Sequence, residues 1–153
     1  IRAAEMALAG AELPEILAKV KEISDNTKLF IGLSSLNNLV KGGRISRATG
    51  LLSSFLNMRI VMDFDHSELI PVVKGRGNKT FTNWFESFKA ELTKLPNVKQ
   101  IGISHADAWE LAEGFKKELE ALFPGMHIPV LQTTPIIATH TGKGAFAITY
   151  YLD

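Results

Sequence analysis

The sequence contains no cysteine among its 153 residues. A disulfide scaffold, a thiol nucleophile and a thiolate zinc site are therefore excluded, and the absence suits a reducing compartment. No apolar run approaches the ~20 residues of a membrane-spanning helix, and the N-terminus lacks the pattern of a secretory signal. We therefore expect a protein of the cytosol.

The sequence also lacks a clear excess of positive or negative charge. The chain carries 17 Lys and Arg against 16 Asp and Glu, which gives a formal net charge of +1. No run of five or more like charges marks an arm for nucleic acid or a patch for an anionic membrane. Binding of a polyanion is therefore a poor first hypothesis.

Repeats, low-complexity tracts and flexible linkers are missing as well, so the sequence predicts one domain. A domain of this length buries roughly 70% of the surface of its unfolded chain and needs no disulfide or metal to fold. The chain opens at Ile1 without Met, and residues 2–8 already have a helix-forming composition. We therefore expect the numbering to begin inside a longer natural protein.

The pattern of apolar residues predicts helices and strands in mixed order. Helical spacing predicts helices at residues 13–23, 36–40, 48–55, 78–95 and 108–122. Short apolar runs predict strands at residues 29–33, 60–64, 69–73, 98–103, 127–131 and 145–151, with residues 136–139 as a further candidate. Some of these strands are joined as hairpins and others are separated by helices. The prediction is an α/β (α+β) fold with a mixed sheet covered by helices.

Residues at the helix ends have recognisable roles. Ser34 or Ser35 is expected to cap the helix at 36–40, and Gly42 to end it in the left-handed conformation. Asp107 and Glu110 have the spacing of a capping box before the helix at 108–122.

Two segments place a cationic or titratable side chain beside glycines: Gly-Gly-Arg-Ile-Ser at residues 42–46 and Thr-His-Thr-Gly-Lys-Gly at residues 139–144. Glycine lets the backbone approach a ligand, so its N–H groups can meet an anion that a neighbouring Arg or His also contacts. These segments indicate anion recognition. In the alternative interpretation, Gly42 and Gly43 only cap a helix, Arg44 forms a surface ion pair, and residues 141–144 form a hairpin turn.

Motifs for catalysis are absent. Gly142-Lys143 lacks the remaining residues of a Walker A loop, and neither a GxGxxG nor a GxSxG pattern occurs. His105 and Asp107 alone are weak evidence for a metal site, and solvation is the simpler explanation for His66 and His127. We expect no metal, no cofactor and no catalytic residue.

Three segments together carry a resemblance to a known family. Residues 36–46, the hairpin at 60–73 with Lys74-Gly75-Arg76 after it, and residues 139–145 resemble the C-terminal domain of the DegV family of bacterial fatty-acid-binding proteins. The resemblance covers nearly the whole chain. It implies a mixed, largely antiparallel sheet of about six strands flanked by helices. It also implies a carrier of a long-chain fatty acid rather than an enzyme.

Carried over from the family, the groups that contact the fatty acid carboxylate are Arg44 and His140. We expect support around them from Gly43, Ser46, Thr141 and Gly142. Helical position suggests Leu52 and Phe55 as contacts of the acyl tail. The family usually has proline where this chain has Lys143.

The resemblance also implies partners. Family members have two domains, so an N-terminal α/β domain that supplies Ser and Thr hydroxyls to the carboxylate site is expected to be missing here. Some members present the bound acid to a fatty acid kinase, which forms the acyl phosphate for phospholipid synthesis. Integral insertion into a membrane is not expected.

Two other classes of function remain open from the residues alone. A small-molecule hydrolase or transferase would need a nucleophile or a carboxylate within reach of His140, and neither is recognisable in the sequence. A protein-interaction module would use the glycine segments to dock a partner.

Overall fold

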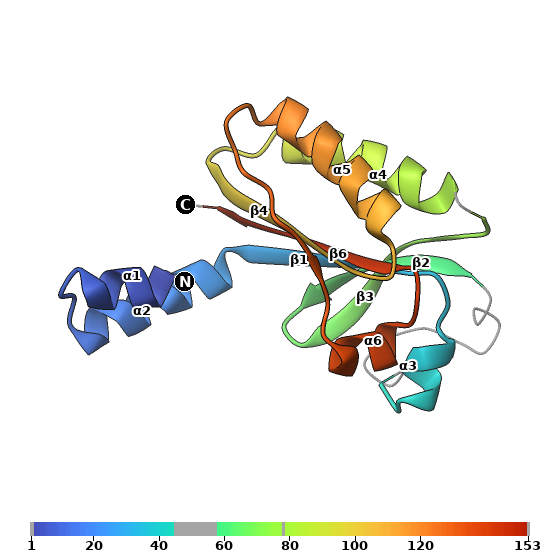
Figure 1. The fold of residues 1–153 in the computed structure, drawn as a ribbon, viewed down its shortest axis with the longest axis horizontal. Helices are drawn as coiled ribbons and strands as arrows, with labels where there is room; N and C mark the ends of the chain where they lie inside the picture. The colour runs from blue at the N-terminus through green and yellow to red at the C-terminus, as the bar shows by residue number, and fades with distance from the viewer. Residues whose placement is uncertain (1, 45–57, 78, 153) are drawn as a thin grey trace.

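The computed structural model describes residues 2–44, 58–77 and 79–152 (Figure 1). The described elements are α1 (Arg2–Leu8), α2 (Leu13–Asp25), β1 (Thr27–Leu33), α3 (Asn37–Lys41), β2 (Arg59–Asp65), β3 (Glu68–Gly75), α4 (Lys79–Leu92), β4 (Val98–Ala106), α5 (Trp109–Leu122), β5 (Val130–Gln132), α6 (Pro135–Thr141) and β6 (Ala145–Leu152). Within these ranges, no helix combines the length and apolar character that crossing a membrane requires.

The described strands form one sheet in the order β3-β2-β1-β6-β4-β5. Every neighbouring pair is antiparallel except β4 and β5, which are parallel and are connected through α5. A parallel connection needs such a crossover, whereas β2 and β3 are joined by a short turn. The predicted mixed, largely antiparallel sheet flanked by helices is therefore confirmed.

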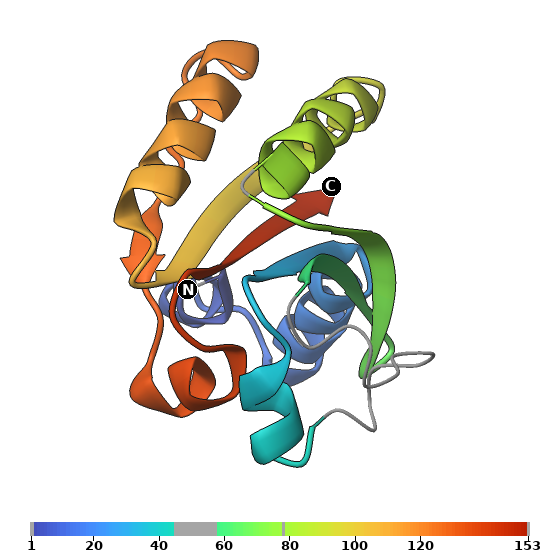
Figure 2. The ribbon, with the colours of Figure 1, turned by 90° about the vertical axis from the view of Figure 1, so that its right-hand side faces the viewer.

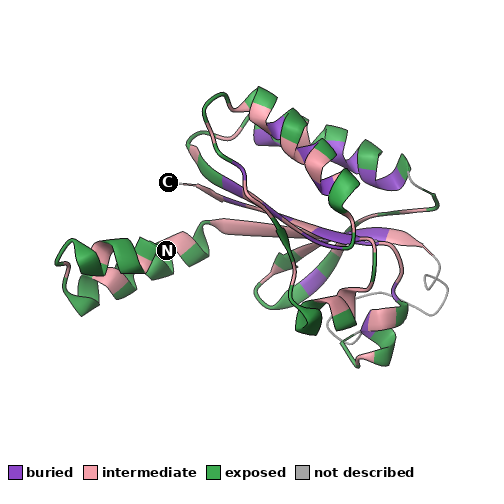
Figure 3. Cartoon of the chain, in the orientation of Figure 1, coloured by how far each residue is buried: buried purple, intermediate pink, exposed green. Residues whose placement is uncertain are grey.

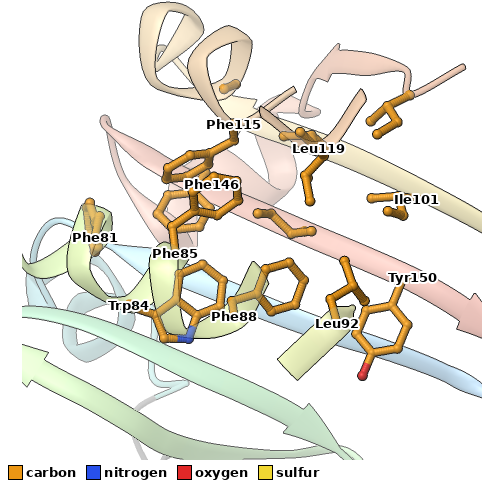
Figure 4. Close-up of a cluster of buried hydrophobic side chains, with 14 of the residues drawn as sticks. Phe81, Trp84, Phe85, Phe88, Leu92, Ile101, Phe115, Leu119, Phe146 and Tyr150 are labelled. Carbon is orange, nitrogen blue, oxygen red and sulfur yellow. The ribbon is translucent and has the colours of Figure 1, made fainter. Parts of the chain in front are cut away.

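Helices α4 and α5 cover one face of the sheet and bury an aromatic core (Figure 2). Phe85 of α4 stacks on Phe115 of α5 with ring centroids 4.0 Å apart, and Phe146 of β6 lies edge-on to Phe115 (Figure 4). Each such pair adds about 0.5–1.5 kcal/mol beyond its buried area. Gly32 of β1 leaves room for this packing, because a Cβ there would lie 2.1 Å from the Phe146 ring.

The opposite face of the sheet is covered at one end by α3 and α6 (Figure 2). We call it the open face. A second apolar cluster lies there, formed by Leu33, Leu36, Leu39, Ile60, Met62, Leu69, Ala106 and Ala145. The two faces are therefore unequal, since one carries the large aromatic core and the other a smaller aliphatic cluster.

The N-terminal helices form a separate feature. Helices α1 and α2 make a hairpin that projects from the start of β1, away from α3 and α6 (Figure 1). Neither helix has a buried residue (Figure 3). Figure 3 shows the contrast with the inner sides of α4 and α5, which are buried.

Two local predictions are wrong, and a third is correct in type but wrong in its bounds. Residues 136–139 lie in α6, which starts at Pro135 after the capping hydroxyl of Thr134. Proline at the first helical position favours this start, although the apolar run resembles a strand. Asp107 does not cap α5, whose N-cap is Ala108. The strand predicted at 127–131 is the shorter β5, and the helix predicted at 48–55 lies outside the described residues.

Candidate functional site

Helices α3 and α6 meet at one end of the open face, although they lie about a hundred residues apart in the sequence. Asn38 of α3 donates a hydrogen bond from Nδ2 to the carbonyl of Thr139 at 3.0 Å. Ser34, which follows β1, donates from Oγ to the carbonyl of Gly144 at 3.0 Å. These two bonds join residues 34–38 to the segment at 139–144.

Gly42 and His140 are in direct contact. A Cβ on Gly42 would lie 2.3 Å from Nδ1 of His140, so only glycine admits the imidazole at this distance. Gly42 itself has a right-handed backbone, with φ −80°, and the left-handed residue is Gly43, with φ 69°. The prediction that Gly42 is left-handed is therefore wrong. The reason for glycine at this position is the close approach of His140.

Arg44 contacts the same glycine. Its Nη1 donates to the carbonyl of Gly42 at 2.7 Å, while the imidazole of His140 packs on the Cα of Gly42. Arg44 is exposed and His140 is half-buried. Nδ1 of His140 is buried and has no hydrogen-bond partner among the described residues. The structure thus brings the two predicted carboxylate-binding side chains to one glycine.

The glycines do not offer their amides to an anion. The N–H groups of Gly42, Gly43, Arg44, Gly142 and Gly144 each donate to a backbone carbonyl. The prediction that backbone N–H groups of both turns contact an anion is therefore wrong for these residues. These five amides are therefore already engaged within the chain.

The remaining predicted site residues differ in position. Gly142, with φ 78°, packs against Asn38, because a Cβ there would lie 2.9 Å from the side-chain oxygen of Asn38. Thr141 directs its hydroxyl to the carbonyl of Ile137 at 3.1 Å. The predicted residues outside the described part of the chain are Ser46, Leu52 and Phe55.

Lys143 forms an ion pair within the chain. Its Nζ lies 2.7 Å from Oδ2 of Asp107, in the turn between β4 and α5. The hydrogen bond from Lys143 lowers the pKa of Asp107, and the same bond raises the pKa of Lys143. Lys143 is therefore engaged by a carboxylate of its own chain.

An apolar groove runs along the open face from α6. A cavity of about 230 Å³ lies between Ile137 and Thr141 of α6 and the strands β1, β4 and β6, and it is followed by one of about 170 Å³. Leu29, Ser104 and Ala147 line both cavities. The groove thus starts at α6, the helix that carries His140.

Small side chains form the floor of this groove. The facing residues of β4 and β6 on the open face are the pairs Gly102 and Thr149, Ser104 and Ala147, and Ala106 and Ala145. The sequence analysis missed these residues. The signal was available, because every second position in residues 102–106 and 145–149 is small, which marks one face of each strand.

Metal ligands do not gather in the described part of the chain. No group of three or more His, Asp or Glu side chains there is arranged to hold a metal ion. His105 is buried and accepts a hydrogen bond at Nδ1 from the N–H of Ala108 at 3.2 Å. We therefore assign His105 to the turn before α5.

The fold and the site define a class of protein: an α/β domain whose open sheet face carries an apolar groove that starts at α6, the helix of His140. The chain belongs to the DegV family, since the family model described as "Uncharacterised protein, DegV family" matches residues 1–153. The resemblance seen in the three sequence segments is thereby confirmed.

Curated relatives match almost the whole chain. A DegV domain-containing protein of Streptococcus pyogenes serotype M3 is 51% identical over 148 residues, which are 97% of this chain and 52% of that protein. A DegV domain-containing protein of Lactococcus lactis is 46% identical over 149 residues, which are 97% of this chain and 53% of that protein. The chain thus spans about half the length of the curated relatives that it matches.

Solved structures share the fold. DegV from Bacillus subtilis, described as a fatty acid binding protein, is 25% identical and superposes with a TM-score of 0.81 over 99% of this chain and 54% of its own. The fatty acid kinase B3 protein of Streptococcus pneumoniae, solved with linoleic acid, is 23% identical with a TM-score of 0.78 over 99% of this chain and 53% of its own. At 23% identity, the second likeness supports the fold alone.

Proposed function

We propose that this chain is the lipid-binding part of a fatty acid carrier. The acyl tail lies in the groove on the open face, and the carboxylate lies at Arg44 and His140. The observations that support the proposal are that Arg44 and His140 both contact Gly42, and that α6, the helix of His140, lines the start of an apolar groove through Ile137 and Thr141. Solved relatives that are described as fatty acid binding proteins support it.

The tail supplies most of the binding free energy. Burial of an acyl chain contributes about 0.8 kcal/mol per CH₂, so a sixteen-carbon acid gains on the order of 10 kcal/mol before ordering costs. The small floor residues of β4 and β6 leave space for the chain, and Leu29 and Ile137 line its sides. A flexible aliphatic chain is the ligand that such a narrow apolar groove fits best.

The carboxylate is the costly end, because an unpaired anion loses several kcal/mol on leaving water. Arg44 meets both carboxylate oxygens with its planar guanidinium, which needs only to leave the carbonyl of Gly42. Nδ1 of His140 is buried against Gly42 without a partner in the described part of the chain, so the carboxylate reaches this atom when the imidazole turns away from Gly42. In this proposal the side chains of Arg44 and His140 bind the carboxylate, because the glycine N–H groups of both segments already donate to backbone carbonyls.

The role that follows is that of a carrier and not of an enzyme. The acid head stays at the end of the groove, where a fatty acid kinase can phosphorylate it, and the product serves phospholipid synthesis. A further part of the same polypeptide, comparable in length to this chain, supplies hydroxyl groups to the carboxylate. The carrier works in the cytoplasm.

Lipid extraction and native mass spectrometry of the complete protein, purified from bacterial cells, test the proposal. We expect one long-chain fatty acid per polypeptide. Arg44→Ala and His140→Ala should each lower the retained fraction at least tenfold, since a charged hydrogen bond contributes about 1.5–3 kcal/mol. Lys143→Ala is the matched control, because Asp107 engages that charge, and it should retain lipid like the wild type.

The tail site is tested separately at Ala147, which lines both cavities of the groove. Ala147→Leu should fill the groove and lower lipid retention, whereas Ala147→Gly should leave the groove open. Unfolding in urea would be measured for both variants. A folded Ala147→Leu protein that retains lipid normally would remove the groove from the proposal.

A further inference from the structure

The apolar groove continues beyond the two cavities beside α6. A third cavity of about 700 Å³ follows them along the sheet, and it shares Gly102, Pro129 and Thr149 with the second cavity. Ile23 of α2 lines the third cavity from the side of the N-terminal hairpin. The three cavities therefore form a series that begins at α6 and ends between the sheet and α2.

The junction of the second and third cavities is open because Gly102 has no side chain. A Cβ on Gly102 would lie 3.5 Å from Cγ2 of Thr149 and 4.0 Å from Cγ of Pro129. Both distances are those of ordinary van der Waals contacts, so one added carbon would span the space between the two walls. The missing side chain thus connects the two cavities.

Both walls of the junction are held by hydrogen bonds. Oγ1 of Thr149 donates to the carbonyl of Lys28 at 3.0 Å, which leaves the methyl group of Thr149 on the side of Gly102. The carbonyl of Pro129 accepts from the N–H of Ile103 at 2.9 Å. Moving either wall away from Gly102 would cost one of these bonds.

The backbone does not require glycine at this position. Gly102 lies inside β4 and is not among the described glycines with positive φ. Glycine in the interior of a strand costs stability, because it packs no side chain, and it often marks a place that a ligand approaches closely. The space at the junction is therefore the reason that we infer for glycine here.

The length of the groove before the junction matches part of a long acyl chain. Ala106, Ser104 and Gly102 lie at alternate positions of β4, so the floor between the first and the last is about 13 Å long. An extended acyl chain advances by about 1.3 Å per carbon, since its C–C bonds of about 1.5 Å follow a zigzag. The first two cavities thus hold on the order of ten carbons.

We propose that Gly102 sets the chain length of the fatty acid that this protein retains. The inference rests on the proposed function, because that function places the acyl tail in the groove. With glycine at the junction, the end of a long acyl chain passes between Thr149 and Pro129 into the third cavity. A side chain at this position would end the groove at the second cavity and select shorter acids.

Competition between two saturated fatty acids tests the proposal on the complete protein. Delipidated wild type and Gly102→Val would each be offered equal amounts of decanoic and palmitic acid, and the bound acids would be quantified by mass spectrometry. The wild type should prefer palmitic acid. Each buried CH₂ changes the affinity about fourfold, so loss of the third cavity should lower the ratio of bound palmitic to decanoic acid at least tenfold.

Gly114→Val is the matched control. It adds the same three carbons to α5, on the other face of the sheet, with nothing within 4 Å of the added Cβ, and it should leave the ratio unchanged. Urea unfolding would show whether Gly102→Val is folded. If it is not, Gly102→Ala takes its place, since its single added carbon makes only ordinary contacts, and it should lower the ratio at least threefold.

The outcomes separate chain-length selection from the carrier function. A wild type that binds neither acid would overturn both proposals. A wild type that prefers palmitic acid, together with a folded Gly102 variant of the same preference, would overturn the role of Gly102 alone. Ala147→Leu fills the groove before the junction and should lower the binding of both acids, whereas Gly102→Val should lower that of palmitic acid only.

Discussion

At the scale of single residues, Gly42 sets the position of His140 through the side chain that it lacks. Gly42→Ala would place a methyl group 2.3 Å from Nδ1 of His140 and 3.0 Å from the carbonyl of Asn38. We expect the imidazole to be displaced, with a destabilisation of about 1–3 kcal/mol from overpacking. The NMR signals of the His140 ring and lipid retention by the complete protein measure the two effects.

Gly114 is the control for this substitution. It lies in the interior of α5 with nothing within 4 Å of an added Cβ. Gly114→Ala should stabilise the protein by about 0.5–1 kcal/mol through helix propensity. A Gly42→Ala protein with unchanged His140 signals would show that the contact does not position the ring.

The ion pair of Asp107 and Lys143 gives a second prediction at this scale. Lys143→Gln should raise the pKa of Asp107 toward its ordinary value, because the hydrogen bond from Lys143 lowers it. A lowered pKa stabilises the folded state above the unfolded pKa, and the contribution is lost as the pH falls through the folded pKa. The wild type and the variant should therefore converge in stability only in acid.

NMR titration of the Asp107 carboxyl group measures this shift directly. Both side chains are exposed, so the effect on stability is small and should weaken at high salt. An Asp107 titration that is the same in the wild type and in Lys143→Gln would contradict the assigned pairing.

At the scale of elements, one side chain joins α3 to α6. Asn38→Ala removes the bond from Nδ2 to the carbonyl of Thr139 and the packing on Gly142. We expect faster hydrogen exchange in α6 and at least severalfold weaker lipid retention in the complete protein. Asn37→Ala is the matched control, since Asn37 is exposed on the same helix. Equal effects of the two variants would mean that the bond does not hold the elements together.

The elements differ in how well local sequence predicts them. Helix α4 and the hairpin of β2 and β3 follow from apolar periodicity, because each packs one regular face on the core. Helix α6 does not, since Ile136 and Ile137 form an apolar run that is exposed in the described structure. Pro135 and the Thr134 cap decide its conformation, and an apolar run alone cannot report them.

The site was predictable in part. The glycine segments and the family resemblance suggest Arg44 and His140. The bond from Arg44 to Gly42 is local, but the contact of His140 with Gly42 depends on a meeting of α3 and α6 that no local pattern encodes. The groove was missed because it depends on the register of β4 against β6. The observed register places Ser104 opposite Ala147 and Ala106 opposite Ala145, so that small residues face each other.

At the scale of the whole molecule, the large aromatic core and the proposed lipid groove lie on different faces of the sheet. The aromatic core under α4 and α5 holds the fold, and the open face carries the groove. Phe85→Ala would remove a fully buried ring that stacks on Phe115, and should cost about 3–5 kcal/mol of unfolding free energy. Substitutions at the floor of the groove should affect lipid retention more than stability.

The hairpin of α1 and α2 lies apart from both faces of the sheet, and we expect it to contribute little to the stability of the chain. Removal of residues 1–25 should change the unfolding free energy of the isolated chain by less than about 1 kcal/mol, because neither helix has a buried side chain. The bond from the N–H of Leu152 to the carbonyl of Asn26 remains to hold the start of β1. Urea unfolding of the truncated and full chains, followed by tryptophan fluorescence from the core, measures the difference. A loss of several kcal/mol would show that the hairpin is an integral part of the sheet domain.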